Sequence, residues 1–408
     1  MPGRGKQRKL CFKLACDEWL PRTGGISQFN RSLAIALARN GHRTLCVVHQ
    51  ASREEFQDAA DHGVVLFTAA PTPDGPMPYL GIPDVIAARP DVVIGHDIVS
   101  GSVAWAYVKH YLPEAKLMQI VHTPHAQNEA YKRPKAATEY TEFREEQIRR
   151  VAVDADVIAA VGPQLARRAE AIIGNAFGVL PVLQLDPGMD VPDSHAGRRR
   201  KPPANFTIMM LTRTGHVEPK GLDLAARAIA ALKVRPGAPL PDLLVRGAQP
   251  KTCDDLRRRL IKLSGLSPDR VDVRPFTPDH TVVTRDLERA ALFVMPSRVE
   301  GFGLAGLEAI AHGTPALVSS KSGLAETLAT KLPMPARSMV VDVTGDDDVD
   351  VAQWCRAIEW SLDNLQASFD HAHEVRDLLA PMLTWEHVVD AIVESVTVPS
   401  RTLHVASP

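Results

Sequence analysis

The sequence predicts an α/β protein made of two doubly wound, Rossmann-like domains, each with a parallel β-sheet covered by helices on both faces. Apolar runs of strand length alternate with helical patterns along the chain, which is the order of elements in such sheets. A polar, proline-containing segment near the middle separates two similar halves. The length of 408 residues is enough for roughly two or three domains of about 150 residues each.

The first half, residues 1–190, is predicted to form the N-terminal domain. Its first strand leads into a helix whose apolar side chains, from Ile26 to Leu37, share one face, and Gly41 ends this helix. The strands predicted in this half are 10–15, 44–48, 64–68, 92–95, 117–122 and 157–161. Ligands of such sheets bind beyond the carboxyl ends of the strands, so the loops after these strands are the expected site.

A linker is predicted over 191–204, where a basic run at 198–201 is interpreted as solvated surface without a function. The second domain is predicted over 205–380. Its predicted strands are 206–212, 243–246, 271–274, 292–295, 316–319 and 339–343, and its helical patterns include 221–232, 351–365 and 368–379. Residues 381–408 contain a last helical pattern, at 385–396.

The composition limits the classes of protein. A formal net charge of -1 and a hydrophobic fraction of 45% argue against disorder and against bulk nucleic-acid binding. The five cysteines are scattered and show no C-x-x-C spacing, which favours a reducing compartment. With no signal-peptide pattern and no stretch long enough to span a bilayer, we expect a cytoplasmic protein.

The most informative segment is 298–326, which is predicted to fold as a loop, a helix, a strand and the start of another helix. Gly301 and Gly303 allow close approach of a ligand to the backbone, and the free amides at the helix start favour anionic oxygens such as those of a diphosphate. Glu308 lies about one turn into the helix, where its carboxylate could accept hydrogen bonds from ribose hydroxyls. Glu300 precedes the turn and could reach the sugar beyond the phosphates.

The same letters also match the dinucleotide fingerprint, because Gly301, Gly303 and Gly306 spell G-x-G-x-x-G. That fingerprint needs its first glycine directly after a strand and an acidic residue at the end of the next strand, about 20 residues on. Here 296–300 separate the strand from the glycine, and the next strand ends in Ser320 and Lys321. The dinucleotide interpretation is therefore the weaker one.

The stretch EGFGLAGLE, with MPS before it and AIAHGTPALVS and SGLAE after it, resembles the E-x7-E signature of the retaining, group 1 glycosyltransferases with the GT-B fold. The resemblance implies that Glu308 binds the donor ribose and that Glu300 contacts hydroxyls of the transferred sugar. It also implies that amides near Gly303 and Leu304 hold the donor diphosphate. In this family the last helices cross back to the first domain, which we expect here for 381–408.

Two further segments support this resemblance. Gly24 and Gly25 precede the first helix and look like the family's glycine-glycine loop, which approaches the donor diphosphate from the other side of the cleft. Arg213 ends a strand and Lys220 is predicted to open a helix, and the family places a cationic pair here to neutralise the diphosphate. The spacing between Arg213 and Lys220 is longer than the family's, which makes Lys220 the less certain of the two.

His122 ends a strand of the first domain and would point into the cleft between the domains. Similar family members carry a histidine there beside the transferred sugar, so His122 is assigned a positioning and electrostatic role. His96 and Asp97 end another strand and are weaker candidates that either line the acceptor pocket or pack and cap. The acidic run 346–348 superficially resembles a metal-binding D-x-D motif, but it is interpreted as a solvated turn without an ordered partner.

The resulting hypothesis is a glycosyltransferase that needs no cofactor or metal. The resemblance implies that it moves a sugar, with retention of anomeric configuration, from a UDP- or GDP-sugar to an unidentified acceptor that is a sugar, lipid, small molecule or protein. The catalytic candidates are Glu300, His122, Arg213 and Lys220. A nucleotide-sugar hydrolase or epimerase, or a non-catalytic nucleotide-sugar sensor, are the alternatives. The basic N-terminus allows a peripheral membrane contact, and no nucleic-acid partner is expected.

Overall fold

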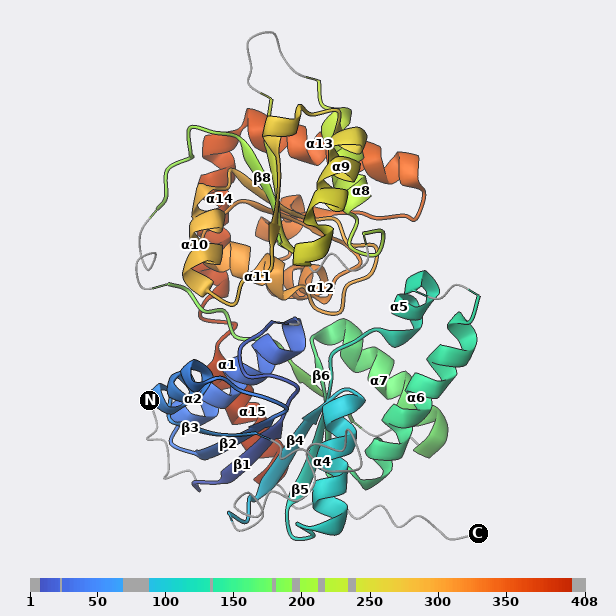
Figure 1. The fold of residues 1–408 in the computed structure, drawn as a ribbon, viewed down its shortest axis with the longest axis vertical. Coiled ribbons are helices and arrows are strands. Elements are labelled where there is room, and N and C mark those ends of the chain that lie inside the picture. Colours follow the sequence, from blue (N-terminus) through green and yellow to red (C-terminus); the bar gives the residue numbers. More distant parts are fainter. Residues whose placement is uncertain are drawn as a thin grey trace.

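The computed structural model describes residues 8–22, 24–68, 88–132, 135–177, 181–192, 199–211, 217–233 and 240–397. Two parallel sheets confirm the predicted fold class (Figure 1). The N-terminal sheet has seven strands in the order β3-β2-β1-β4-β5-β6-β7. These strands are β1 (Cys11–Ala15), β2 (Arg43–Val48), β3 (Val64–Thr68), β4 (Val92–His96), β5 (Lys116–Val121), β6 (Val157–Val161) and β7 (Leu183–Leu185).

Helices connect these parallel strands. They are α1 (Gly25–Arg39), α2 (Arg53–Asp61), α4 (Val99–His110), α5 (His125–Lys132), α6 (Ala137–Asp154) and α7 (Pro163–Phe177). The strands of the sheet centre are almost wholly buried, as in β4, because helices cover both of their faces. The short edge strand β7 was not predicted, since three residues with one buried side chain carry little periodic signal.

The second sheet has six strands in the order β10-β9-β8-β11-β12-β13. Its strands are β8 (Thr207–Leu211), β9 (Asp242–Ala248), β10 (Val271–Pro275), β11 (Leu292–Met295), β12 (Ala316–Ser319) and β13 (Val340–Val341). Its helices are α8 (Leu222–Ala230), α9 (Cys253–Ser264), α10 (His280–Arg289), α11 (Leu304–Ala311), α12 (Gly323–Lys331), α13 (Asp347–Asp363) and α14 (Leu365–Leu379), with short 3-10 turns at Pro250–Thr252, Pro268–Arg270 and Pro335–Met339. β13 is shorter than the predicted strand 339–343, because the 3-10 turn extends to Met339.

The chain returns to the N-terminal domain at its end. Helix α15 (Trp385–Thr397) packs against α1 and β7, and the amide of Met189 donates to the carbonyl of Leu383 at 2.8 Å, where the two crossing segments meet. One apolar cluster includes β-strand residues of the first domain together with Phe302 and Leu324 of the second. The two domains are therefore in close contact.

The basic run at 198–201 is not merely solvated surface, so that interpretation was wrong for Arg200. Its guanidinium donates to the hydroxyl of Thr314 at 2.8 Å and to the carbonyl of His312 at 3.1 Å, and its amide donates to Nε2 of His373 at 3.0 Å. Charge counting could not show this, because these acceptors belong to the turn after α11 and to α14. Arg200 thus fixes the segment after the linker to the second domain.

No helix in these ranges is both long enough and apolar enough to cross a membrane.

Candidate active site

Glu300 lies in the loop between β11 and α11, where the second domain faces the first. Its Oε2 atom accepts hydrogen bonds from Nζ of Lys220 at 2.8 Å and from the hydroxyl of Ser297 at 3.1 Å. The side chains of Glu300 and Lys220 are 17% and 29% exposed. A carboxylate and an ammonium group are thus paired, yet both remain partly exposed to solvent.

Helix α11 begins at a position that only glycine occupies without strain. Gly303 precedes the helix with φ 106°, and no side chain caps the helix start. Within the described residues, the starts of α1 after Gly24 and of α8 after Gly221 are likewise not capped by a side chain. By contrast, Ser or Asp side chains accept hydrogen bonds from the first amides of α2, α10, α12 and α13. The first amide of α8, that of Leu222, donates instead to the carbonyl of Val217 at 3.2 Å, so the helix starts of α1 and α11 are the ones suited to another acceptor.

The helix starts of α1 and α11 face each other across the domains (Figure 1). A Cβ atom built on Gly25 would lie 3.3 Å from Cδ1 of Leu304. One built on Gly301 would lie 2.6 Å from the carbonyl oxygen of His122. The structure thus brings together Gly24 and Gly25, the loop of Glu300 and the histidine at the end of β5, as one surface between the domains.

Glu308 lies on α11 and is only partly exposed. Burial raises the pKa of its carboxyl group to about 7, and the nearby carboxylate of Asp190 contributes in the same direction. Asp190 follows β7 and accepts a hydrogen bond from Nε1 of Trp385 at 3.2 Å. Near neutral pH, Glu308 is therefore present in both protonation states, and a hydrogen-bond donor or a cation beside it would favour its charged form.

His122 is supported by a chain of buried polar side chains. Its Nε2 lies 2.9 Å from Nδ1 of His96, whose own Nε2 lies 2.9 Å from Oδ1 of Asn30. The ring of Phe29 packs edge-on against His122, with 5.0 Å between the ring centres. Burial lowers the pKa of His122 well below its usual value, and His96 adds to this effect. Both rings are therefore neutral at physiological pH. Because Oδ1 of Asn30 can only accept, Nε2 of His96 donates to it and Nε2 of His122 donates to Nδ1 of His96, which leaves Nδ1 of His122 as an acceptor.

The burial of His96 and Asp97 favours packing and capping, one of the two roles expected for them, over lining an acceptor pocket. Their exposed fractions are 2% and 6%. The carboxylate of Asp97 accepts hydrogen bonds from the amide of His122 at 2.7 Å and from the hydroxyl of Thr123. Asp97 has φ 45°, an uncommon conformation for a residue other than glycine. Both residues therefore position His122.

Arg213 lies outside the described residues. The helix that Lys220 was predicted to open begins at Leu222, and Gly221 precedes it. Among the described residues, no group of three or more His, Cys, Asp or Glu side chains lies together in a way that could hold a metal ion.

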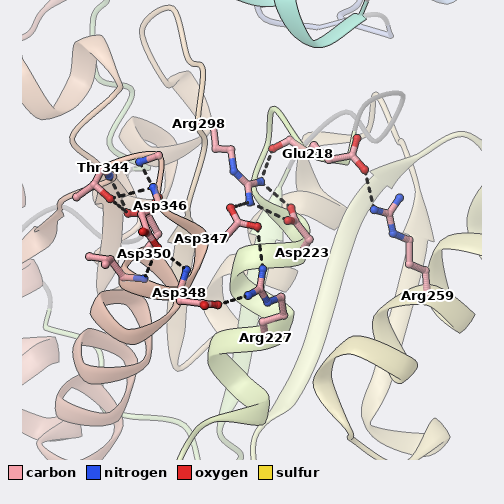
Figure 2. Close-up of polar contacts among 12 residues, drawn as sticks. Glu218, Asp223, Arg227, Arg259, Arg298, Thr344, Asp346, Asp347, Asp348 and Asp350 are labelled. Carbon is pink, nitrogen blue, oxygen red and sulfur yellow. Dashed lines mark hydrogen bonds and ion pairs between the residues drawn. The ribbon is translucent and has the colours of Figure 1, made fainter. Parts of the chain in front are cut away.

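The interpretation of 346–348 as an unpartnered turn was wrong (Figure 2). Asp346 caps α13 by accepting hydrogen bonds from the amides of Asp348 and Val349. The carboxylate of Asp347 accepts from Arg298 and from Arg227 at 2.8 Å each, and that of Asp348 accepts from Arg227 at 3.0 Å. The partners lie far from this run in the sequence, so the local pattern of charges could not reveal them.

Several residues at the site were not found from the sequence. Ser297 could have been found, because its hydroxyl belongs to the MPS segment beside Glu300. Asn30 also had a signal, as an amide in the middle of a mostly apolar helix. The sequence contains no such signal for Arg298 and Asp190, because their roles depend on neighbours that are distant in the chain.

Comparisons with known proteins bear on the family and the fold. A family model described as "Family 4 Glycosyltransferase in conflict systems" matches residues 13–392. A D-inositol 3-phosphate glycosyltransferase of Geodermatophilus obscurus is 28% identical over 331 residues, covering 78% of this chain and 68% of the relative. A GDP-mannose-dependent phosphatidylinositol monomannoside mannosyltransferase of Mycolicibacterium smegmatis is 26% identical, covering 77% and 82%. The structure of HepE from Anabaena with UDP and glucose superimposes with a TM-score of 0.69 at 14% identity, covering 95% of this chain and 99% of HepE.

Proposed function

Because the chain belongs to the family 4 glycosyltransferases in conflict systems, we propose that it transfers a sugar from a UDP- or GDP-sugar to a hydroxyl of an acceptor, with retention. The observation that carries this proposal is the pair formed by Lys220 and Glu300 at 2.8 Å, beside the uncapped start of α11. A cation, free amides and a carboxylate are what the diphosphate and the sugar of such a donor require.

The diphosphate would be held at the start of α11. Its oxygens would accept hydrogen bonds from the amides of Leu304 and its neighbours, and Lys220 would contribute a positive charge. Arg213 is proposed for the same role on the grounds of the family resemblance. As the glycosidic bond breaks, the departing diphosphate gains negative charge, so these groups would stabilise the transition state more than the bound donor. This arrangement would need no metal ion.

The two glutamates would hold opposite ends of the donor. Glu308 would accept hydrogen bonds from the ribose hydroxyls, which would favour its charged form. Glu300 would bind hydroxyls of the transferred sugar, while Lys220 would turn from Glu300 toward a phosphate oxygen. The neutral ring of His122 would contact the sugar from the other domain.

The carboxylate of Asp97, near His122, is only 6% exposed and already bonded, which makes it a poor nucleophile for a double displacement. We therefore favour attack of the acceptor from the face that the diphosphate leaves, with a donor phosphate oxygen taking the acceptor proton. Retention is a consequence of that geometry.

Two similar proteins support UDP or GDP as the nucleotide of the donor. One is named as GDP-mannose-dependent, and the structure of the other contains UDP and glucose. The named relatives act on inositol phosphate or a phosphatidylinositol mannoside. This supports an acceptor that carries a sugar-like or lipid-linked hydroxyl, with a small molecule or a protein as the other classes to test.

The first experiment is a panel of UDP-, GDP- and ADP-sugars and NAD, in which thermal stabilisation and nucleotide release are recorded. We expect one sugar nucleotide to stabilise the wild type and to be turned over when an acceptor is present. Glu300→Ala should retain much of the stabilisation and lose most of the release, because Glu300 acts on the sugar rather than on the nucleotide.

The exposed Glu394 on α15 provides a control, and Glu394→Ala should behave as wild type. Stabilisation by NAD alone would contradict the proposal, as would equal release from wild type and Glu300→Ala. Release that does not depend on an acceptor would indicate a hydrolase. Proton NMR of the product reports the anomeric configuration, and inversion would contradict the proposed geometry.

A further inference from the structure

Lys220 lies in a loop before α8, and backbone contacts join that loop to the segment before Glu300. The carbonyl of Pro219 accepts hydrogen bonds from the amide of Arg298 at 2.9 Å and from that of Val299 at 3.2 Å. A Cβ atom built on Gly221 would lie 1.9 Å from the carbonyl oxygen of Pro296. The loop that carries Lys220 therefore rests directly on the chain that carries Glu300.

The guanidinium of Arg298 reinforces this joint (Figure 2). Its Nη1 donates to the carbonyl of Glu218, and its two Nη atoms donate to the two carboxylate oxygens of Asp223, each at 2.8 Å. Nη2 also donates to Asp347 at 2.8 Å. One planar group thus ties the Lys220 loop to the starts of α8 and α13.

Arg298 is committed to this joint and is not available to a ligand. Its side chain is only 9% exposed, and four of the hydrogen bonds that its terminal nitrogens can donate go to Glu218, Asp223 and Asp347. Burial would lower the pKa of its guanidinium, but the hydrogen bonds to Asp223 and Asp347 outweigh that effect and raise it. The group therefore stays charged and paired.

A lysine could not make the same joint. The planar fork of arginine matches both oxygens of Asp223 and still reaches a carbonyl and a second carboxylate, whereas an ammonium group is a compact charge without a fixed plane. Arg227 provides an internal comparison, because it bonds Asp347 and Asp348 in the same network, and neither of these bonds reaches the Lys220 loop.

We propose that Arg298 is a positioning residue that holds the ammonium group of Lys220 where the donor diphosphate binds. This inference rests on the proposed function, since it assigns Lys220 to the diphosphate. Arg298 acts only through the Lys220 loop, so its effect on nucleotide binding disappears when Lys220 is absent.

A double-mutant cycle tests this dependence. UDP and GDP binding to the full chain is measured by calorimetry for wild type, Arg298→Lys, Lys220→Ala and the double variant, together with melting temperatures. Arg298→Lys should weaken binding of the preferred nucleotide about tenfold, the effect of about 1.4 kcal/mol. Lys220→Ala should weaken binding at least as much, and the double variant should bind no worse than Lys220→Ala.

Arg227→Lys is the matched control. It disturbs Asp347, the carboxylate that both arginines share, so its melting temperature should also fall, but its nucleotide affinity should stay within about twofold of wild type. If Arg298→Lys does not fold, Asp347→Asn takes its place, because it keeps the arginine and removes one of its partners. Asp347→Asn should then weaken nucleotide binding by less than about tenfold, and it should have no effect on binding when Lys220 is also replaced.

Additive effects of Arg298→Lys and Lys220→Ala would overturn the inference, as would an equal loss of affinity in Arg227→Lys. Such results would leave the proposed function intact, because Lys220→Ala alone would still weaken binding. A wild type that binds neither nucleotide, nor any sugar derivative of them, would overturn the proposed function and this inference together.

Discussion

At the scale of single residues, Glu308 has a carboxyl group whose protonation state a ligand can change. Its carboxyl group lies among protein atoms and near Asp190, and burial and that carboxylate raise its pKa to about 7. In the unfolded chain the pKa would be the ordinary value of about 4.3. Without a ligand, the negative charge of Glu308 therefore destabilises the folded protein, although the proposed binding of ribose hydroxyls would use this charge.

The protein should lose stability through Glu308 as the pH rises from about 4.5 to above 7, because the unfolded chain loses this proton first. We expect Glu308→Gln, which is neutral at every pH, to melt higher than wild type at pH 8, with the difference shrinking steadily toward pH 5. The gain is at most about 4 kcal/mol, and less because the side chain is only partly buried.

Melting temperatures of ligand-free protein between pH 5 and 8.5 measure this effect. Glu394→Gln, at an exposed position of α15, makes the same change in net charge and should show no such trend. The proposal for ribose binding adds a second expectation, that Glu308→Gln binds the donor more weakly although it is more stable. A difference that does not change with pH would refute the assigned pKa.

At the scale of elements, the helix starts at the site depend on glycine for steric reasons. Gly221 before α8 has φ 66°, as has Gly265 after α9. A side chain at Gly265 would meet nothing within 4 Å, whereas one at Gly221 would meet the carbonyl of Pro296 at 1.9 Å. The two positions share one backbone conformation and differ in their surroundings, so they form a natural pair for comparison.

Gly265→Ala should cost about 1 kcal/mol, the strain of a left-handed alanine. Gly221→Ala should cost about 2–4 kcal/mol, because it adds an overlap with backbone that cannot rotate away. It should also displace the neighbouring Lys220 and weaken nucleotide binding, which Gly265→Ala should leave unchanged. Chemical denaturation and nucleotide titration of both variants check this expectation, and equal costs would contradict it.

At the scale of the whole molecule, the two domains touch at backbone. Gly301 lies against the carbonyl oxygen of His122, and a Cβ atom built on Gly301 would lie 2.6 Å from that oxygen. Other contacts between the domains are softer. The ion pair of Arg167 with Glu326 is well exposed on its Arg167 side, and such exposed pairs contribute about 0–1 kcal/mol. The more buried pair of Lys331 with Asp186, at 3.1 Å, adds to the charge contacts, but close approach of the domains also requires the absence of a side chain at Gly301.

Gly301→Ala should hold the domains apart without unfolding either one. We expect a melting temperature near that of wild type, a larger radius of gyration with nucleotide bound, and a loss of about a hundredfold in kcat/KM, the effect of a misplacement of about 1 Å. Small-angle scattering and steady-state kinetics measure these quantities.

Gly174→Ala on α7, where a Cβ atom would meet nothing within 4 Å, is the control and should be close to wild type in both measurements. An unchanged radius of gyration for Gly301→Ala, together with lost activity, would indicate local damage to Glu300 instead of a block to closure.

The sequence alone determined the fold class and most of the strands, because alternating apolar runs are a local property of the chain. It also placed Glu300, Glu308 and Gly303 around one helix start, since these residues lie within a single short motif. Its interpretations differed from the structure at Arg200 and at 346–348, and it left the role of His96 and Asp97 open. In each case the partner that decides the outcome lies in another element.

Only the tertiary structure paired Lys220 with Glu300, set Asn30 and His96 behind His122, and surrounded Arg298 with Asp223 and Asp347. The physical reason is that hydrogen bonds and ion pairs act over about 3 Å in space, whatever the separation along the chain. Sequence spacing reports periodic burial and local turns, while the packing of elements decides which polar groups meet, and so which residues position the site.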